Sequence, residues 1–210
     1  MVDGYFGAPP RPDEVRLVNG ELAGRRIEGT NDDKLAERCR ILRNHGQPSP
    51  PEHRDFVEAG LNYRITDIQA AIGLAQLEKL PRILEARKEI ARQYLREFSS
   101  SEGITLPASH PDHSWQTFML VLDDELRRDS IVAALAEHGI GTGPGSVAAH
   151  CGALYQNRFG YRPEELPVSA KLASHGLALP VYEGLSASQV SECATLVRQA
   201  IERERSSRIG

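Results

Sequence analysis

The stretch GLNYRITDIQAA, residues 60–71, joins a polar turn to the beginning of a helix. Thr66 and Gln69 have the spacing of a capping box, in which a hydroxyl and an amide satisfy backbone N–H groups at a helix start. The helix that follows, over about residues 67–79, is apolar nearly all round. A helix of that kind must be buried on more than one side. We therefore expect it to pack against its own domain and against a second subunit.

The sequence upstream of this stretch divides at Thr30. Residues 1–29 show no period of 3.6 or 2 and are predicted to be an irregular leader. From Thr30, polar residues at 31–33 cap a helix that ends before Gly46. Downstream, Pro81 suits the first turn of another helix, over about 82–98. Residues 30–98 are interpreted as the remnant of a larger domain with interdomain helices.

Residues 99–210 alternate strands and helices and are predicted to form a small C-terminal domain. The expected strands are 115–122, 140–142 and 177–179. The expected helices are 126–138, 167–175 and one opened by the capping box of Ser186 and Gln189. The predicted fold class is α/β (α+β), with a long helix pair followed by a small sheet and packed helices.

Net charge, apolar runs and cysteine spacing indicate which partners and which cellular compartment to expect. A formal net charge of −4 in 210 residues gives no reason to expect nucleic acid or an anionic membrane as partner. No apolar run approaches the roughly 20 residues that span a bilayer, and no secretory signal is visible. Three cysteines lie far apart, without the spacing of a redox pair. We expect a reduced, cytoplasmic protein.

Seven short segments share one order and spacing with a known family. They are TNDD (30–33), LRNHG (42–46), the block 60–80, HSW (113–115), GIGTG (139–143), FGY (159–161) and LPVY (179–182). From Thr30 onward the chain resembles the C-terminal part of a DegT/DnrJ/StrS aminotransferase. The resemblance implies the C-terminal portion of a type I pyridoxal-phosphate aminotransferase fold. It also implies a homodimer in amino-sugar and polysaccharide biosynthesis, with a keto-sugar nucleotide and glutamate as substrates.

The resemblance assigns roles to three residues. In the family the Asn62 position reaches the cofactor phosphate of the neighbouring subunit, so Asn62 is a candidate for cofactor binding. The alternative is that Asn62 only shapes the turn. Arg64 is a candidate for gripping a substrate phosphate or carboxylate, or it forms an ion pair with Asp67. His150 is a weaker candidate for substrate binding.

The chain departs from the family at the catalytic lysine. Family members hold the cofactor as a Schiff base on a lysine upstream of the TNDD segment. The four lysines here are Lys34, Lys79, Lys88 and Lys171, and none has that position. Residues 24–29, GRRIEG, replace the expected glycine-rich strand, and a buried strand would not carry these charges. No catalytic residue is therefore assigned.

Three other groups of residues give weaker indications of function. Gly145 and Ser146 stand where the family commonly has a His-Tyr pair. His110, Asp112 and His113 offer too few convergent ligands for zinc, so no metal is expected. His150 and Cys151 are neighbours, and adjacent side chains rarely point at each other with catalytic geometry.

Two classes of function remain. The first is a truncated sugar aminotransferase, binding pyridoxal phosphate by family likeness and inactive for want of the lysine. The second is a non-catalytic module that dimerises with itself or pairs with a full-length homologue. The product of an interrupted gene is a third explanation of the same pattern.

Overall fold

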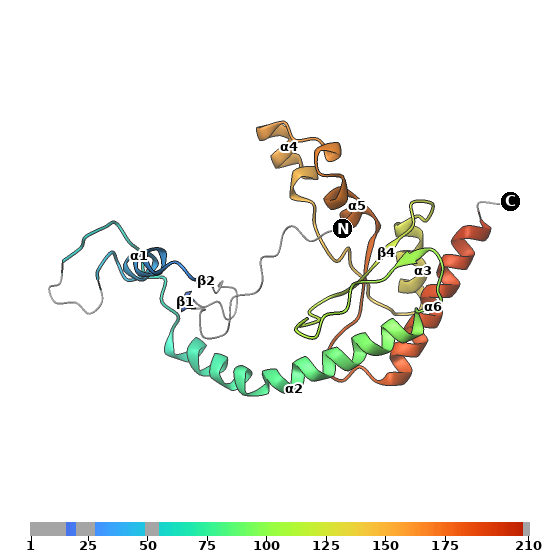
Figure 1. The fold of residues 1–210 in the computed structure, drawn as a ribbon, viewed down its shortest axis with the longest axis horizontal. Coiled ribbons are helices and arrows are strands. Elements are labelled where there is room, and N and C mark those ends of the chain that lie inside the picture. The colour runs from blue at the N-terminus through green and yellow to red at the C-terminus, as the bar shows by residue number, and fades with distance from the viewer. Residues whose placement is uncertain (1–15, 20–27, 49–54, 208–210) are drawn as a thin grey trace. The chain divides into compact units, whose positions relative to one another are not determined.

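The structure, a computed structural model, describes residues 16–19, 28–48 and 55–207. The chain divides between Lys79 and Leu80 into two compact units. The long helix α2 (Asp67–Glu97) begins in the first unit and ends in the second (Figure 1).

In the first unit, two strands precede a helix. Strands β1 (Arg16–Asn19) and β2 (Glu28–Thr30) pair antiparallel, although the sequence around them shows no strand period. The prediction of an irregular leader is therefore wrong for these residues, because backbone pairing does not require alternating side chains. Residues 24–27 of the GRRIEG run lie outside the described residues.

Helix α1 (Asp33–Arg43) begins where the polar cap predicts. The Asp32 carboxylate accepts hydrogen bonds from the backbone N–H groups of Lys34 at 2.9 Å and Leu35 at 3.1 Å, as an N-cap should. Gly46, just beyond the helix, has a φ of 77°. A Cβ atom there would overlap the Glu58 carbonyl group, so this turn requires glycine.

Helix α2 is one continuous helix and not the predicted pair. Pro81 lies inside it, where it removes one backbone hydrogen bond. The predicted break is wrong because buried contacts beyond the proline hold the helix: Ile90, Tyr94 and Phe98 are all in the core. The capping box is confirmed, since Gln69 N–H donates to Thr66 Oγ1 at 3.3 Å and Thr66 N–H donates to Gln69 Oε1 at 3.0 Å.

The second unit contains a three-stranded antiparallel sheet in the order β3 (Ile104–Thr105), β4 (Phe118–Leu122), β5 (Gly176–Leu179). The strand predicted from 115 begins only at Phe118, because Trp115 has a φ of 49°, outside the extended region. The strand predicted at 140–142 is replaced by a single bridge between Gly143 and Ala178.

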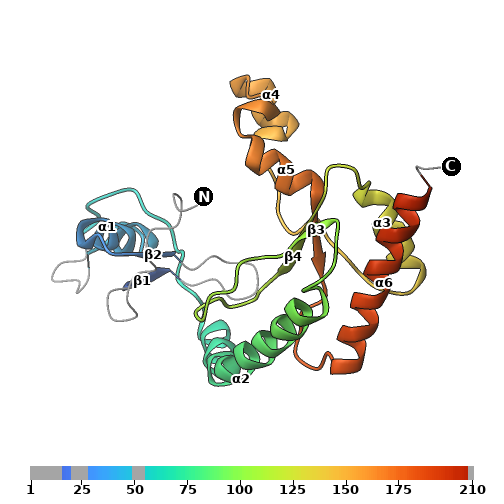
Figure 2. The same cartoon turned by 45° about the vertical axis from the view of Figure 1, so that its right-hand side comes forward.

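Helices surround this sheet in the second unit. They are α3 (Arg128–Glu137), α4 (Ala153–Phe159), α5 (Pro167–His175) and α6 (Ala187–Ser206), with 3-10 turns η1 (Ala149–Cys151) and η2 (Pro163–Glu165). Helices α3 and α6 lie side by side, whereas α4 extends away from the sheet (Figures 1 and 2). The Ser186 capping box is confirmed.

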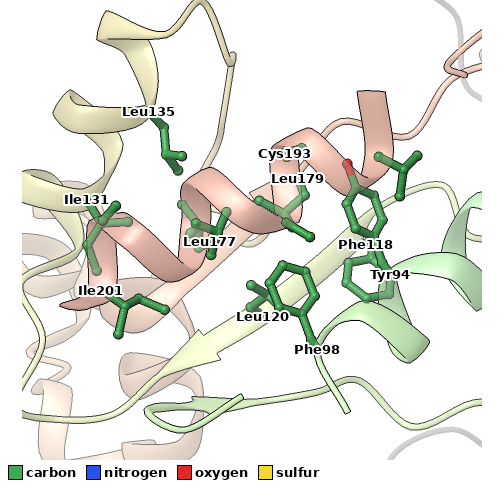
Figure 3. Close-up of a cluster of buried hydrophobic side chains, with 14 of the residues drawn as sticks. Tyr94, Phe98, Phe118, Leu120, Ile131, Leu135, Leu177, Leu179, Cys193 and Ile201 are labelled. Carbon is green, nitrogen blue, oxygen red and sulfur yellow. The ribbon is translucent and has the colours of Figure 1, made fainter. Parts of the chain in front are cut away.

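One hydrophobic core holds the second unit together. Side chains from α2, β4, β5, α3 and α6 meet there: Tyr94, Phe98, Phe118, Leu120, Leu177, Leu179, Ile131, Leu135, Val190, Cys193 and Ile201 (Figure 3). On β4 the buried side chains alternate with half-buried ones, as expected for a strand with one face on the core. Within the described ranges, no helix is long and apolar enough to cross a membrane.

Candidate functional site

The segment that carries Asn62 is fixed against the C-terminal end of α1. Asn62 and Asn44 form an antiparallel bridge. Three backbone hydrogen bonds accompany it: Leu61 N to Leu42 O at 2.9 Å, Tyr63 N to Arg43 O at 2.9 Å, and His45 N to Leu61 O at 3.1 Å. The backbone at Asn62 is therefore held by regular pairing just before α2 begins.

Arg64 lies beside Asn62, and two polar contacts determine its position. Its backbone N–H donates to Asn62 Oδ1 at 3.4 Å, and its guanidinium Nη1 donates to Asn44 Oδ1. The alternative of an ion pair with Asp67 is not what the structure contains, because the guanidinium contacts the neutral amide of Asn44. The contact through Asn62 Oδ1 is a local turn contact, and cofactor binding by Asn62 stays a prediction.

These contacts leave donors that suit an anion. Asn62 uses its side-chain oxygen in the turn, and among the described residues no acceptor is hydrogen-bonded to its side-chain NH₂ group. Arg64 uses one of its five N–H groups on Asn44. Both side chains are exposed, and both precede the positive end of the α2 dipole. The pair therefore fits a phosphate or carboxylate group in its chemistry.

His150 lies in the second unit, in the η1 turn, with only 5% of its surface exposed. Its Nε2 atom is 3.4 Å from the Pro163 carbonyl oxygen and 3.3 Å from the Cys151 sulfur. The expectation that these neighbours would not face each other is wrong, because the tight η1 turn bends the two side chains together. The structure thus brings Asn62 and Arg64 together in one unit and places His150 in the other.

The four lysines all lie on helices. Lys34 is on α1, Lys79 and Lys88 are on α2, and Lys171 is on α5. Lys88 is half-buried and the others are exposed. The ammonium group of Lys171 forms an ion pair with Asp124 at 2.9 Å, and this pairing lowers the pKa of the Asp124 carboxyl. None of them lies beside Asn62 in a described hydrogen bond or ion pair.

Gly145, which stands at a position where the family commonly has histidine, has a physical reason to be glycine. Its φ is 70°, in the left-handed region. A Cβ atom at this position would collide with the side chain of Met119 on β4. Glycine at position 145 therefore fits the close packing of this loop against Met119.

A cleft of about 530 Å³, which no sequence pattern predicted, lies in the second unit between the end of α3 and the start of α6. Tyr182, His138 and Glu192 line its polar part, and Tyr94 and Cys193 form its buried wall. Burial raises the pKa of both the Tyr94 phenol and the Cys193 thiol. Two segments that resemble the family, GIGTG (139–143) and LPVY (179–182), supply residues to the lining of this cleft.

Both the sequence and the fold of this chain are similar to those of known proteins. The sequence profile of the DegT/DnrJ/EryC1/StrS aminotransferase family matches residues 29–198. The spore coat polysaccharide biosynthesis protein SpsC of Bacillus subtilis is 29% identical over 188 residues, which are 82% of this chain and 48% of that protein. The protein MJ1066 of Methanocaldococcus jannaschii is 29% identical over 84% of this chain and 49% of its own length.

Solved structures show the same likeness. PseC of Helicobacter pylori, an aminotransferase involved in the biosynthesis of pseudoaminic acid, is 26% identical with a TM-score of 0.73, over 84% of this chain and 48% of its own. DesV of S. venezuelae is 31% identical with a TM-score of 0.72, over 83% of this chain and 46% of its own. The chain thus spans about half the length of the relatives it matches, with the fold of that part of an aminotransferase.

Proposed function

The chain belongs to the DegT/DnrJ/EryC1/StrS aminotransferase family, and on that premise we propose that it serves as the C-terminal portion of a sugar aminotransferase. The intact reaction moves an amino group, commonly from glutamate, onto a keto-sugar nucleotide. Pyridoxal phosphate, when bound, supplies the carbonyl group that carries the amino group between the two substrates. The observation that supports this proposal most directly is the pairing of Asn62 with Arg64 in the segment that most resembles the family.

The chain's own residues are proposed to bind and orient anionic groups. The Asn62 side-chain NH₂ group would donate to a phosphate oxygen of the cofactor bound by a neighbouring subunit. Arg64 offers a charged fork for a substrate phosphate or carboxylate, and its contact with Asn44 keeps that fork from rotating freely. His150 is a candidate for substrate contact because its imidazole carries both a donor and an acceptor.

The chain by itself is proposed to be inactive in transamination. Each of its four lysines is accounted for as a helix residue, and three of them are exposed. A residue that bonds covalently to the cofactor must be held beside the carbonyl carbon of that cofactor, which an exposed lysine on a helix surface does not provide. The lysine would then be supplied by sequence other than residues 1–210.

A titration with pyridoxal phosphate, followed by borohydride reduction and peptide mapping, tests both the proposed phosphate binding and the proposed inactivity of the chain. We expect saturable binding that exceeds the binding of unphosphorylated pyridoxal, and no adduct concentrated on one lysine. Asn62→Ala should weaken binding of the phosphorylated ligand about tenfold or more, as the loss of an amide hydrogen bond predicts, and Arg64→Ala should weaken binding of a sugar nucleotide or of glutamate by a similar factor. Arg40→Ala, an arginine of the same unit that pairs with Glu37 at 3.2 Å, is the matched control.

Each result has a clear meaning. A specific adduct at Lys34, Lys79, Lys88 or Lys171 would overturn the proposed inactivity. Equal affinity for pyridoxal and its phosphate, or an equal loss of affinity in the Arg40→Ala control, would overturn the phosphate role of Asn62. Unchanged substrate affinity in Arg64→Ala would overturn the substrate role of Arg64.

An interaction module is a second candidate, and one observation favours it. The start of α2 exposes large apolar side chains: Ile68 at 74%, Leu74 at 65% and Leu77 at 61%. The predicted burial of this helix against its own domain is therefore not present in the described chain, and burial against a second subunit stays a prediction. Contiguous exposed apolar surface of this kind marks an interaction site. Size-exclusion with light scattering, alone and after mixing with a full-length relative, tests it, and monomers in both samples would refute it.

A further inference from the structure

We propose that Cys151 is a nucleophilic thiol activated by His150, and that it is a site of covalent modification by soft electrophiles. The proposal rests on the η1 turn alone and does not depend on the proposed function. Cys151 Sγ and His150 Nε2 are 3.3 Å apart, within hydrogen-bonding distance for sulfur. The histidine is 5% exposed and the cysteine is half-buried, so the imidazole is held in place while the sulfur remains in reach of a small reagent.

Two neighbours of His150 Nε2, the Cys151 sulfur and the Pro163 carbonyl oxygen, determine how a proton is held on this nitrogen. Nε2 is also 3.4 Å from the carbonyl oxygen of Pro163, and a carbonyl oxygen only accepts hydrogen bonds. A proton that moves from the Cys151 thiol to Nε2 is therefore stabilised by the Pro163 carbonyl oxygen and lies between that oxygen and the sulfur. A sulfur that receives an N–H hydrogen bond is stabilised as the thiolate, which is the reactive form of cysteine.

The proposed reaction is an alkylation of the Cys151 thiol, and it needs no reactant other than the electrophile. The neutral His150 ring that acts as base carries its proton on Nδ1, and the Cys151 thiol gives its proton to the free Nε2. The thiolate attacks the methylene carbon of a haloacetamide, the sulfur–carbon bond forms, and the carbon–halogen bond breaks to release halide. The imidazolium then returns its proton to solvent. The pair thus has the two elements of an activated nucleophile, a thiol and a base within contact distance.

The chain contains its own controls. Cys39 on α1 is also half-buried, but no described side chain is hydrogen-bonded to it. Cys193 on α6 is 5% exposed, and desolvation raises the pKa of its thiol. An ordinary free cysteine is only a few per cent thiolate near neutral pH. We therefore expect the order of reactivity Cys151, then Cys39, then Cys193.

The test is time-resolved labelling of the full chain with iodoacetamide at pH 6.5, with the rate at each cysteine followed by peptide mass spectrometry. Cys151 should react about tenfold faster than Cys39, because His150 is in position to accept the thiol proton as the sulfur attacks. His150→Asn should reduce the Cys151 rate to near that of Cys39. An unchanged Cys39 rate in the variant shows that the first unit is intact, and slow labelling of Cys193 shows the same for the second.

Two results would overturn the proposal. One is a Cys151 rate equal to or below that of Cys39 in the unmodified chain, a measurement that needs no variant. The other is a fast Cys151 rate that His150→Asn leaves in place while Cys193 stays protected. Cys151→Ser, which should remove the fast phase entirely, confirms the assignment of that phase to the correct peptide.

Discussion

Replacing Tyr94 tests the packing of the core. The effect of the replacement on the free energy of unfolding should change sign as the pH rises. Its ring lies between Phe98 and Phe118, with centroid distances of 6.1 and 5.0 Å, and its hydroxyl donates to the Pro180 carbonyl oxygen at 3.2 Å. The side chain is fully buried. Desolvation raises the pKa of its phenol far above the ordinary value, with a smaller contribution from Cys193.

The Tyr94→Phe variant separates the hydrogen bond from the titration. Near neutral pH it should lower the free energy of unfolding by about 1 kcal/mol, because a buried hydrogen bond is lost and Pro180 keeps an unpaired acceptor. At alkaline pH the unfolded tyrosine ionises near a pKa of about 10 while the folded one stays protonated. The stabilisation is therefore complete below pH 10 and is lost as pH rises, by about 1.4 kcal/mol per pH unit.

The two effects cancel near pH 11. Below this pH the unmodified protein should be the more stable, and above it the Tyr94→Phe variant. Urea unfolding between pH 7 and pH 12 measures this, with the fluorescence of Trp115, the single tryptophan, as the probe. Trp115 is 4% exposed in the same core, and far-UV circular dichroism supplies a second probe. Tyr161→Phe, at an exposed ring, is the control. A constant difference between variant and parent at every pH would refute the reasoning.

Three further substitutions test other parts of the structure. Leu120→Ala should cost about 3–5 kcal/mol in urea unfolding, because the side chain is fully buried on β4; a loss no larger than that of half-buried Val121→Ala would contradict the assigned register. Ser186→Ala should lower the thermal midpoint by a few degrees through loss of about 1 kcal/mol of capping, and Gln189→Ala should add little to it if the two act as one box. Ile72→Glu, at a side chain 51% exposed on α2, should leave unfolding unchanged within about 0.5 kcal/mol but abolish any dimer seen by light scattering; a large loss of stability in the monomer would show that this face is buried within the chain.

Local chemistry made several features predictable from residues alone. The capping boxes at Thr66 and Ser186 and the Asp32 cap depend on side chains within three residues of the backbone groups they satisfy. The helix over 167–175 and the family assignment likewise follow from residue types in order along the chain. Such features need no knowledge of distant contacts, so the sequence by itself determined them.

Other features were decided by tertiary structure. Helix α2 continues through Pro81 because its later residues are buried in the core, and the contact of Arg64 with Asn44 joins residues 20 positions apart. The approach of Cys151 to His150 results from a tight turn whose φ and ψ angles no residue pattern specified. In each case the deciding free energy comes from groups far apart in sequence, or from a backbone conformation that packing selects, and only the folded chain determines those.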